Sequence, residues 1–267
     1  MSPRRRALLV LAATAPLLAL APAARAMGGQ DCAPEDLAPV DAWLAANEGH
    51  GDEATPPTLA ASACVVSPVD KGVLIVAAAY DRGTAYAKDF IAALVDRRAA
   101  RVRSVFKGAI DEDASMSVLQ GSLRIDTARY DLAAGVRAFG VDVSSGKSGP
   151  RCAEASFGAG RTLFVPDGTS LRPVLSSVLL ESWQLVSGNI CPSIGDDSDA
   201  VMEHTATTIS LSPHASHGFA DLVLTTIRDS VPQRRTSVVL RYNGSTYGSN
   251  NWHPWFSSLV APQRTPR

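Results

Sequence analysis

The chain has 267 residues, a formal net charge of −1 and four cysteines. This length accommodates one large domain or two small ones. The balanced charge argues against a nucleic-acid-binding protein, because such proteins usually carry a strong basic surplus.

The first 26 residues have the pattern of a secretory signal peptide. Three arginines at 4–6 precede an apolar run at 7–21, and the small-x-small tripeptide at 24–26 predicts cleavage between Ala26 and Met27. The run is too short to span a bilayer stably, and no later segment has the roughly 18 apolar residues of a transmembrane helix. We therefore expect a soluble protein without a transmembrane anchor, periplasmic or secreted. The Sec route is favoured, and the arginines leave the twin-arginine (Tat) route open.

Charge divides the rest of the chain. The signal peptide takes away four arginines and no acids, which leaves 241 residues with a net charge of −5. Residues 27–70 hold eight acids and no lysine or arginine, whereas residues 71–267 carry a net charge of +3. We therefore divide the chain into a signal peptide (1–26), an acidic, partly irregular N-terminal segment (27–70) and a single β-rich domain (71–267). The acidic segment either lies against a basic face or remains solvated.

The acidic segment contains one predicted helix. Residues 39–46 have helix-forming composition, with Asp36 near the start and Trp43 as the one large apolar anchor. The stretch 50–63 has no periodic pattern and is predicted to be irregular.

All four cysteines lie after the signal peptide, so export places them where disulfides form and persist. Four cysteines permit three pairings. We predict the sequence-local one, which joins Cys32 to Cys64 and Cys152 to Cys191. Each bridge would add about 3–4 kcal/mol to stability by restricting the unfolded chain. Zinc binding is not expected, because no two of these cysteines have the close spacing of a zinc-ligand pair.

From residue 72 onwards the pattern predicts mostly strands. The basic and smaller residues of 101–107 mostly alternate, as in a strand with one wet face, and Asn243-Gly244 predicts a tight turn. Segments 84–95 and 171–186 also fit a helical spacing, but short strands surround them and we assign both to strands. The other predicted strands are 73–80, 122–126, 136–143, 162–165, 207–211, 221–227 and 237–242.

About ten such strands predict a mainly β fold. We expect an antiparallel sandwich or an open, barrel-like β domain with a short N-terminal helix. An α+β fold is the alternative, which applies if the two ambiguous segments are helical.

Two local sequences approach catalytic motifs without matching them. Residues 140–148 look like a phosphate loop, but Gly140 sits one position too early and Pro150 interrupts the helix that must follow. Residues 144–147 fit the S-x-x-K pattern, but its S-D-N and K-T-G companions do not occur. The G-x-S-x-G nucleophile motif does not occur either. The sequence therefore predicts no cofactor and favours a non-catalytic protein.

The histidines are the main candidate metal or catalytic side chains, while the acidic clusters 111–113 and 196–199 are predicted to be solvated turns, with weak calcium binding as the alternative. His214 and His217 form the one close pair and are the candidate metal ligands. Pro213 and Gly218 flank them and predict a loop. A dispersed catalytic site, which leaves no local motif, would use His204, His214 or His217 with nearby acids.

The C-terminal aromatic segment 251–256 either docks into the core or forms a surface for a protein or glycan. Arginine supplies 21 of the 25 basic residues, a composition associated with GC-rich bacterial genomes. The sequence thus predicts an exported binding, accessory or inhibitor-type protein of the bacterial envelope. Its expected partner is an envelope or extracellular protein or a glycan, not a nucleic acid. The alternatives are an exported hydrolase with a dispersed histidine-containing site and a structural envelope component.

Overall fold

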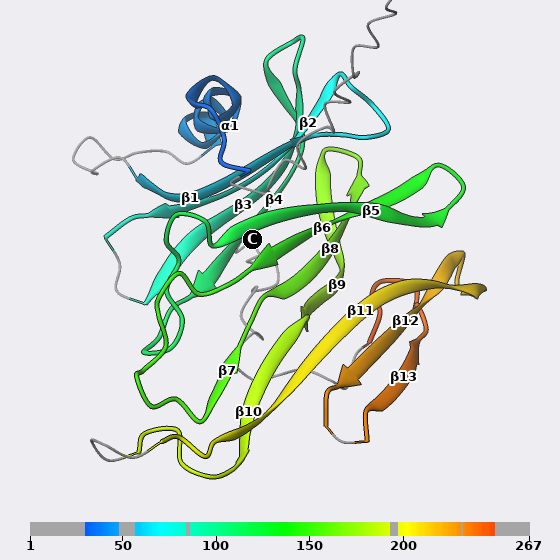
Figure 1. The fold of residues 1–267 in the computed structure, drawn as a ribbon. Coiled ribbons are helices and arrows are strands. Elements are labelled where there is room, and N and C mark those ends of the chain that lie inside the picture. The colour runs from blue at the N-terminus through cyan, green and yellow to red at the C-terminus, as the bar shows by residue number, and fades with distance from the viewer. Residues whose placement is uncertain (1–29, 48–56, 84–85, 193–196, 231, 249–267) are drawn as a thin grey trace, which may run out of the picture.

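The computed structural model describes residues 30–47, 57–83, 86–192, 197–230 and 232–248. The predicted signal peptide with its cleavage site at Ala26 and Met27, and the aromatic segment 251–256, lie outside the described residues. Within them the chain forms one helix and thirteen strands in two sheets (Figure 1). The predicted mainly β class is therefore confirmed.

The first sheet contains eight strands. Their bounds are β1 (Thr58–Val66), β2 (Val73–Asp81), β3 (Ala87–Asp96), β4 (Arg101–Asp111), β5 (Leu123–Ala133), β6 (Val136–Val143), β8 (Gly160–Asp167) and β9 (Ser170–Leu179). They follow the order β1-β2-β3-β4-β9-β8-β6-β5. All neighbours are antiparallel except β4 and β9, which are parallel and pair only Val105 with Ser170.

The second sheet contains five antiparallel strands in the order β13-β12-β11-β10-β7. Their bounds are β7 (Ala155–Phe157), β10 (Glu181–Ser187), β11 (Val201–Ser216), β12 (Phe219–Arg228) and β13 (Arg234–Leu240). In Figure 1 the lower ends of β10, β11, β12 and β13 reach beyond the eight-stranded sheet. The upper end of the five-stranded sheet in Figure 1 is therefore packed against the eight-stranded sheet, and its lower end is not.

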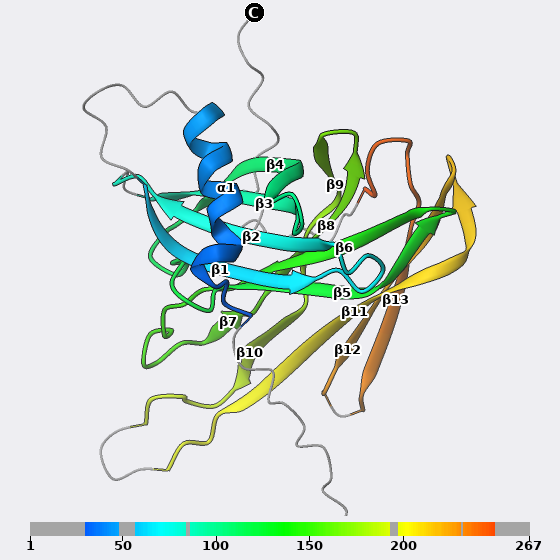
Figure 2. The ribbon, with the colours of Figure 1, turned by 90° about the horizontal axis from the view of Figure 1, so that it is seen from above.

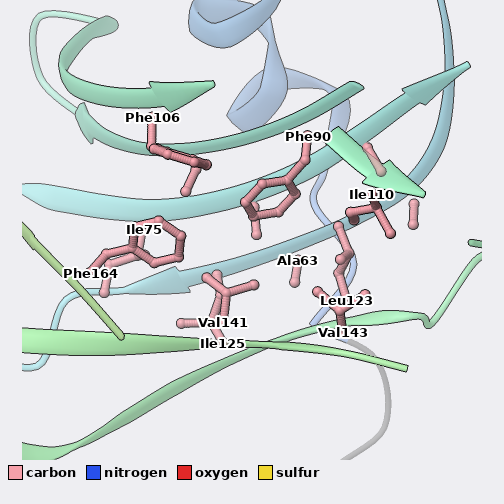
Figure 3. Close-up of a cluster of buried hydrophobic side chains, with 14 of the residues drawn as sticks. Ala63, Ile75, Phe90, Phe106, Ile110, Leu123, Ile125, Val141, Val143 and Phe164 are labelled. Atoms are coloured by element: carbon pink, nitrogen blue, oxygen red, sulfur yellow. The ribbon is translucent and has the colours of Figure 1, made fainter. Parts of the chain in front are cut away.

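The eight-stranded sheet curls around an aromatic core (Figure 3). The ring of Phe164 lies 5.2 Å from Phe106 and 5.8 Å from Phe139 between centroids, and Phe90 completes the group at 6.4 Å. Tilted and offset rings at such distances attract one another in addition to their burial. The interior of the curl is thus filled by side chains from strands that are distant in sequence.

Gln30 joins the two edges of this sheet. Its carbonyl oxygen accepts a hydrogen bond from the amide of Cys64 in edge strand β1 at 2.6 Å. Its side-chain amide donates to the carbonyl of Ile125 in edge strand β5 at 3.0 Å and accepts from the Ile125 amide at 2.6 Å. The nearby Cys32–Cys64 disulfide anchors the same segment to β1. The hydrogen bonds of this one residue thus replace strand pairing between β1 and β5, and they close the curled sheet.

Helix α1 (Pro34–Asn47) begins five residues earlier than predicted. The first position of a helix tolerates proline such as Pro34, because an N–H there would have no intrahelical acceptor. Glu35 and Asp36 in the first turn favour the positive end of the helix dipole. The prediction treated Pro39 as the start, but this proline lies buried inside the helix.

The helix covers the face of the first sheet that points away from the second sheet (Figures 1 and 2). Leu37, Val40 and Leu44 form one buried stripe against residues of β2 and β3. Trp43, the predicted anchor, is only half-buried and contributes at the margin. Asp41 accepts a hydrogen bond from the Tyr80 hydroxyl at 2.8 Å, so one of the acids also holds the helix to the sheet.

The prediction that 50–63 is irregular is wrong from residue 58, because β1 begins there and pairs with β2. The start of β1, from Thr58 to Ala63, consists mainly of small residues, which have a low propensity for strands. The assignments of 84–95 and 171–186 to strands are confirmed by β3, from residue 87 onwards, and by β9 and β10, while residues 84–85 lie outside the described residues.

The two sheets meet at a second apolar core, where the C-terminal turn also folds back. The Asn243-Gly244 turn is confirmed, with Gly244 at a φ of 96° and a bridge between Tyr242 and Tyr247. The Tyr247 amide donates to the Val174 carbonyl of β9 at 2.7 Å. The buried members of this core are Tyr130, Leu132, Ala138, Leu163, Val165, Val174, Leu175, Val178, Leu222, Leu224, Leu240, Tyr242 and Tyr247.

Arg161 of β8 ties β5, β6 and β8 together. Its guanidinium bonds both oxygens of Asp142 at 2.6 and 2.8 Å, and also bonds Asp126 and, at 2.9 Å, the hydroxyl of Tyr130. It passes over Gly140, where a Cβ would lie 3.1 Å from Arg161 Cδ. Burial opposes the charge of Arg161, but its carboxylate partners outweigh burial and raise its pKa. Burial raises the pKa of Tyr130 to about 12.

Candidate functional site

Both disulfides have the sequence-local pairing. Cys32 bonds Cys64 and Cys152 bonds Cys191, with sequence separations of 32 and 39 residues. Two disulfides are compatible with an oxidising compartment. The Cys152–Cys191 bridge ties the segment before β7 to the loop after β10, next to the site described below.

Metal chemistry finds no support in the part of the chain that the structure describes. There, no three His, Cys, Asp or Glu side chains come together as a metal would require. Among these same residues, no helix combines the length and apolarity needed to cross a bilayer.

The two candidate metal ligands occupy different local structures. His214 lies inside β11, in the irregular stretch of pairing between Leu211 and Ala215, so the predicted loop is wrong at this position. His217 and Gly218 form the turn between β11 and β12, with φ of 49° and 87°, which suits a two-residue hairpin. The His217 Nδ1 lies 2.9 Å from the Tyr242 carbonyl oxygen, so its imidazole holds the turn in place.

A pocket of about 430 Å³ opens on the five-stranded sheet. It contains His204, the remaining histidine of the predicted dispersed site. Its described lining residues are Ser156, Gly158, Glu181, Ser182, Trp183, His204, Thr205, Ala206, Ile227 and Asp229.

Strand register explains why these residues meet. Trp183 of β10 lies directly opposite Ser156 of β7 on one side and His204 of β11 on the other. In the next row, Glu181 lies opposite Ala206, which lies opposite Ile227 of β12. Directly opposed residues in a sheet share a face. The two rows therefore form one continuous patch over four strands.

This patch belongs to the outer face of the sheet. Side chains alternate between faces along a strand. Ile209 and Leu211 of β11, which are odd-numbered, belong to the core between the sheets, whereas His204 and Ala206 are even-numbered and exposed. The outer face thus points away from the eight-stranded sheet.

Asp229 is fixed to the backbone of His204 rather than to its ring. The His204 amide donates to Asp229 Oδ1 at 2.7 Å, and the Asp229 amide donates to the His204 carbonyl at 3.1 Å. Within the described residues the imidazole of His204 makes no hydrogen bond. The arrangement orients the carboxylate of Asp229 but does not create an acid–imidazole pair.

The two described serines of the pocket do not form a nucleophile–base pair with His204. Ser156 is two strands from His204, or about 9–10 Å between backbones, with Trp183 between them. Ser182 alternates with Trp183 and belongs to the opposite face. Nucleophilic catalysis by serine requires the hydroxyl and the imidazole within hydrogen-bond reach.

Gly158 makes room for Glu181 at the rim of the pocket. Its amide donates to the Glu181 carbonyl at 2.8 Å. A Cβ at position 158 would lie 2.2 Å from Glu181 Cγ. Any larger residue would therefore displace the Glu181 side chain.

Sequence reasoning singled out His204 but not Trp183, Glu181 or Asp229. The alternation in 181–187 contained a signal for one outward face, yet the cross-strand partners depend on register, which the local pattern does not encode. In comparisons with known proteins, no family model, no curated protein and no solved structure matches this chain.

Proposed function

We propose that this chain is an exported, non-catalytic binding protein of the bacterial envelope. Its partner, an envelope or extracellular protein or a glycan, docks on the outer face of the five-stranded sheet. The observation that carries the proposal is the pocket around Trp183 and His204 on a face that none of the described residues covers. Pockets that combine apolar and aromatic lining with a few polar groups are the usual places for ligands.

Exposed apolar side chains around the pocket support the same face. Nine large hydrophobic side chains are exposed among the described residues, and two of them, Met202 of β11 and Val239 of β13, lie on the outer face. By register they lie opposite Leu185 and Val223. Exposed apolar side chains on the same face as a pocket favour an interaction surface.

Export rests on the N-terminal sequence and on the disulfides. The arginines, apolar run and cleavage pattern before Met27 are those of a signal peptide. Two disulfides would persist in the periplasm or outside the cell and would be reduced in most bacterial cytoplasms.

Site-specific photocrosslinking tests the docking face. Benzoylphenylalanine is placed at Ala206, in the pocket, or at Arg129, whose side chain is 84% exposed on β5 of the other sheet. Each protein is incubated with envelope extract under oxidising conditions. We expect one saturable adduct from position 206, competed by unlabelled protein, and none from position 129. Equal adducts from both positions, or none from either, would overturn the proposal.

His204 supports a second candidate function, an exported hydrolase. It lies in a pocket beside a carboxylate, and catalytic contacts can tighten only when substrate binds. Turnover of a generic ester or glycan by the mature protein, abolished in His204→Ala and retained in His214→Ala, would favour hydrolysis over binding.

A further inference from the structure

The pocket lining is electrically one-sided. Two of its ten described residues, Glu181 and Asp229, carry carboxylates, and none is a lysine or arginine. Trp183 contributes the one large aromatic ring to the lining. On the same face, Arg235 of β13 lies opposite Ile227, one of the lining residues.

The two carboxylates flank the aromatic ring. Glu181 precedes Trp183 by two residues on the same strand face, which separates them by about 7 Å along β10. On the other side, His204 lies opposite Trp183 at about 5 Å between Cβ atoms. The Asp229 carboxylate is held to the His204 amide at 2.7 Å. The two acids therefore lie on opposite sides of Trp183: the Glu181 side chain lies over Gly158 towards β7, and Asp229 lies beyond His204 on the β12 side.

Both carboxylates retain free acceptor capacity. Asp229 uses Oδ1 for the His204 amide, and its Oδ2 has no hydrogen-bond partner within the described residues. The Glu181 carboxylate has no hydrogen bond or ion pair there either. By contrast, Glu203 on the opposite face is neutralised by Arg228, with 3.7 Å between Oε1 and Nη1. The acids of the pocket thus differ from Glu203 in lacking a basic partner among the described residues.

We propose that this pocket binds an organic cation, an ammonium or guanidinium group. The ring of Trp183 would contact the face of the cation, the carboxylate of Glu181 would accept its N–H bonds, and Asp229 would add negative charge on the other side of the pocket. The inference deepens the proposed function and rests on it, because the cation would be the part of the partner that enters the pocket. A metal ion fits poorly, since no three-ligand group is present among the described residues.

A matched pair of probes tests the charge directly. N-acetyl-L-arginine amide carries one guanidinium, and N-acetyl-L-citrulline amide is its neutral counterpart of the same shape. Binding is followed by calorimetry and by the indole N–H signal that disappears in Trp183→Phe. We expect saturable binding of the arginine probe, weakened by added salt, and at least about ten-fold weaker binding of the citrulline probe. Equal binding of the two probes, or tighter binding of a neutral sugar, would overturn the inference.

Variants with retained shape locate the site. Glu181→Gln should weaken binding of the arginine probe by about ten-fold. Asp229→Asn should weaken it less, because Asp229 is further from Trp183, and Asn at 229 can still accept from the His204 amide. Trp183→Leu should weaken it by about two- to thirty-fold, the range of a cation–aromatic contact. Gln184→Ala, the next position on the opposite face of β10, is the matched control and should leave the affinity unchanged.

Two further variants test the position of the Glu181 side chain and the sign of the charge on the ligand. Gly158→Ala should weaken the arginine probe, because its Cβ would displace the Glu181 side chain. Arg235→Gln should tighten binding by removing a competing positive charge at the border of the pocket. Weaker binding in Arg235→Gln would contradict the assigned charge of the ligand.

The inference and the proposed function fail separately. If the probe binds and suppresses the adduct from position 206, the cation belongs to the docked partner. If the probe binds without suppressing that adduct, the site takes a free small cation. If the probe does not bind but the adduct at 206 persists and is lost in Trp183→Leu, the cation inference is wrong while the docking face stands.

Discussion

Side chains alternate between the two faces in both sheets, but the sheets differ in how far those faces are covered. In β2 of the eight-stranded sheet, eight of nine residues are buried, because α1 covers one face and the aromatic core fills the other. In β13 of the five-stranded sheet, six of seven residues are exposed. The first sheet also closes its edges through Gln30, whereas no described residue pairs with the outer edge of β13. The contrast teaches that a strand covered on both faces serves the core, whereas an uncovered edge strand presents surface.

The largest expected effect comes from the aromatic core. Phe164 is fully buried against three other phenylalanines, so Phe164→Ala should cost about 3–5 kcal/mol in free energy of unfolding. Val239, which is 55% exposed, is the counterpart in the second sheet, and Val239→Ala should stay within about 0.5 kcal/mol. Urea denaturation measures both. Comparable losses in the two variants would mean that the outer face is not a free surface.

Removal of a disulfide should have the next largest effect. Replacing Cys32 and Cys64 by serine releases a loop of 32 residues from its constraint, which should cost about 3–4 kcal/mol. The Cys152–Cys191 loop of 39 residues predicts a nearly equal loss.

The consequences of the two losses should differ in place. Amide hydrogen exchange should accelerate throughout the first sheet without Cys32–Cys64, but mainly in β7, β10 and β11 without Cys152–Cys191. Exchange that rises equally in both sheets for both variants would remove the distinction between them. Non-reducing peptide mapping of the unmodified protein provides the control, and four free thiols would contradict both bridges.

The contrast between the sheets also separates what the sequence predicts from what it leaves open. The predicted strands 73–80 and 136–143 correspond closely to β2 and β6, because runs of apolar and β-branched residues are local signals. The predicted strands 221–227 and 237–242 overlap β12 and β13, which pair as a hairpin. The start of β1 was missed, since its three alanines and Ser62 enter the sheet through pairing with β2 rather than through propensity.

Contacts between distant segments could not be predicted in this way. Nothing local to Gln30 indicates that its side chain bonds Ile125, 95 residues away. The pocket likewise draws Ser156, Trp183 and His204 from three strands, and a shift of one residue in register would send each side chain to the other face. The sequence identifies candidate residues such as His204, but strand register decides which side chains lie next to one another.

Gln30→Ala tests the closure of the first sheet. The variant loses both side-chain hydrogen bonds to Ile125, at about 0.5–1.5 kcal/mol each, so we expect a loss of about 1–3 kcal/mol. Gln184→Ala removes a glutamine from the second sheet whose side-chain bond to Glu203 is long at 3.4 Å, and should change stability by less than about 0.5 kcal/mol. Urea midpoints compare the two, and an equal, negligible effect would show that the edges close without Gln30.

The smallest expected effect is acid sensitivity at the turn between β3 and β4. Hydrogen bonds from the Ala99 amide and from Arg103 lower the pKa of Asp96 to about 2, from an ordinary value of 3.8. Because the folded pKa is the lower one, this contribution is present above about pH 3.8 and is lost as the pH falls towards 2. Asp96→Asn should therefore lower the urea midpoint at pH 6 and make it fall less steeply between pH 4 and pH 2. Parallel pH profiles for the two proteins would mean that this exposed turn contributes nothing, and that the first sheet owes its stability to its core and its closed edges alone.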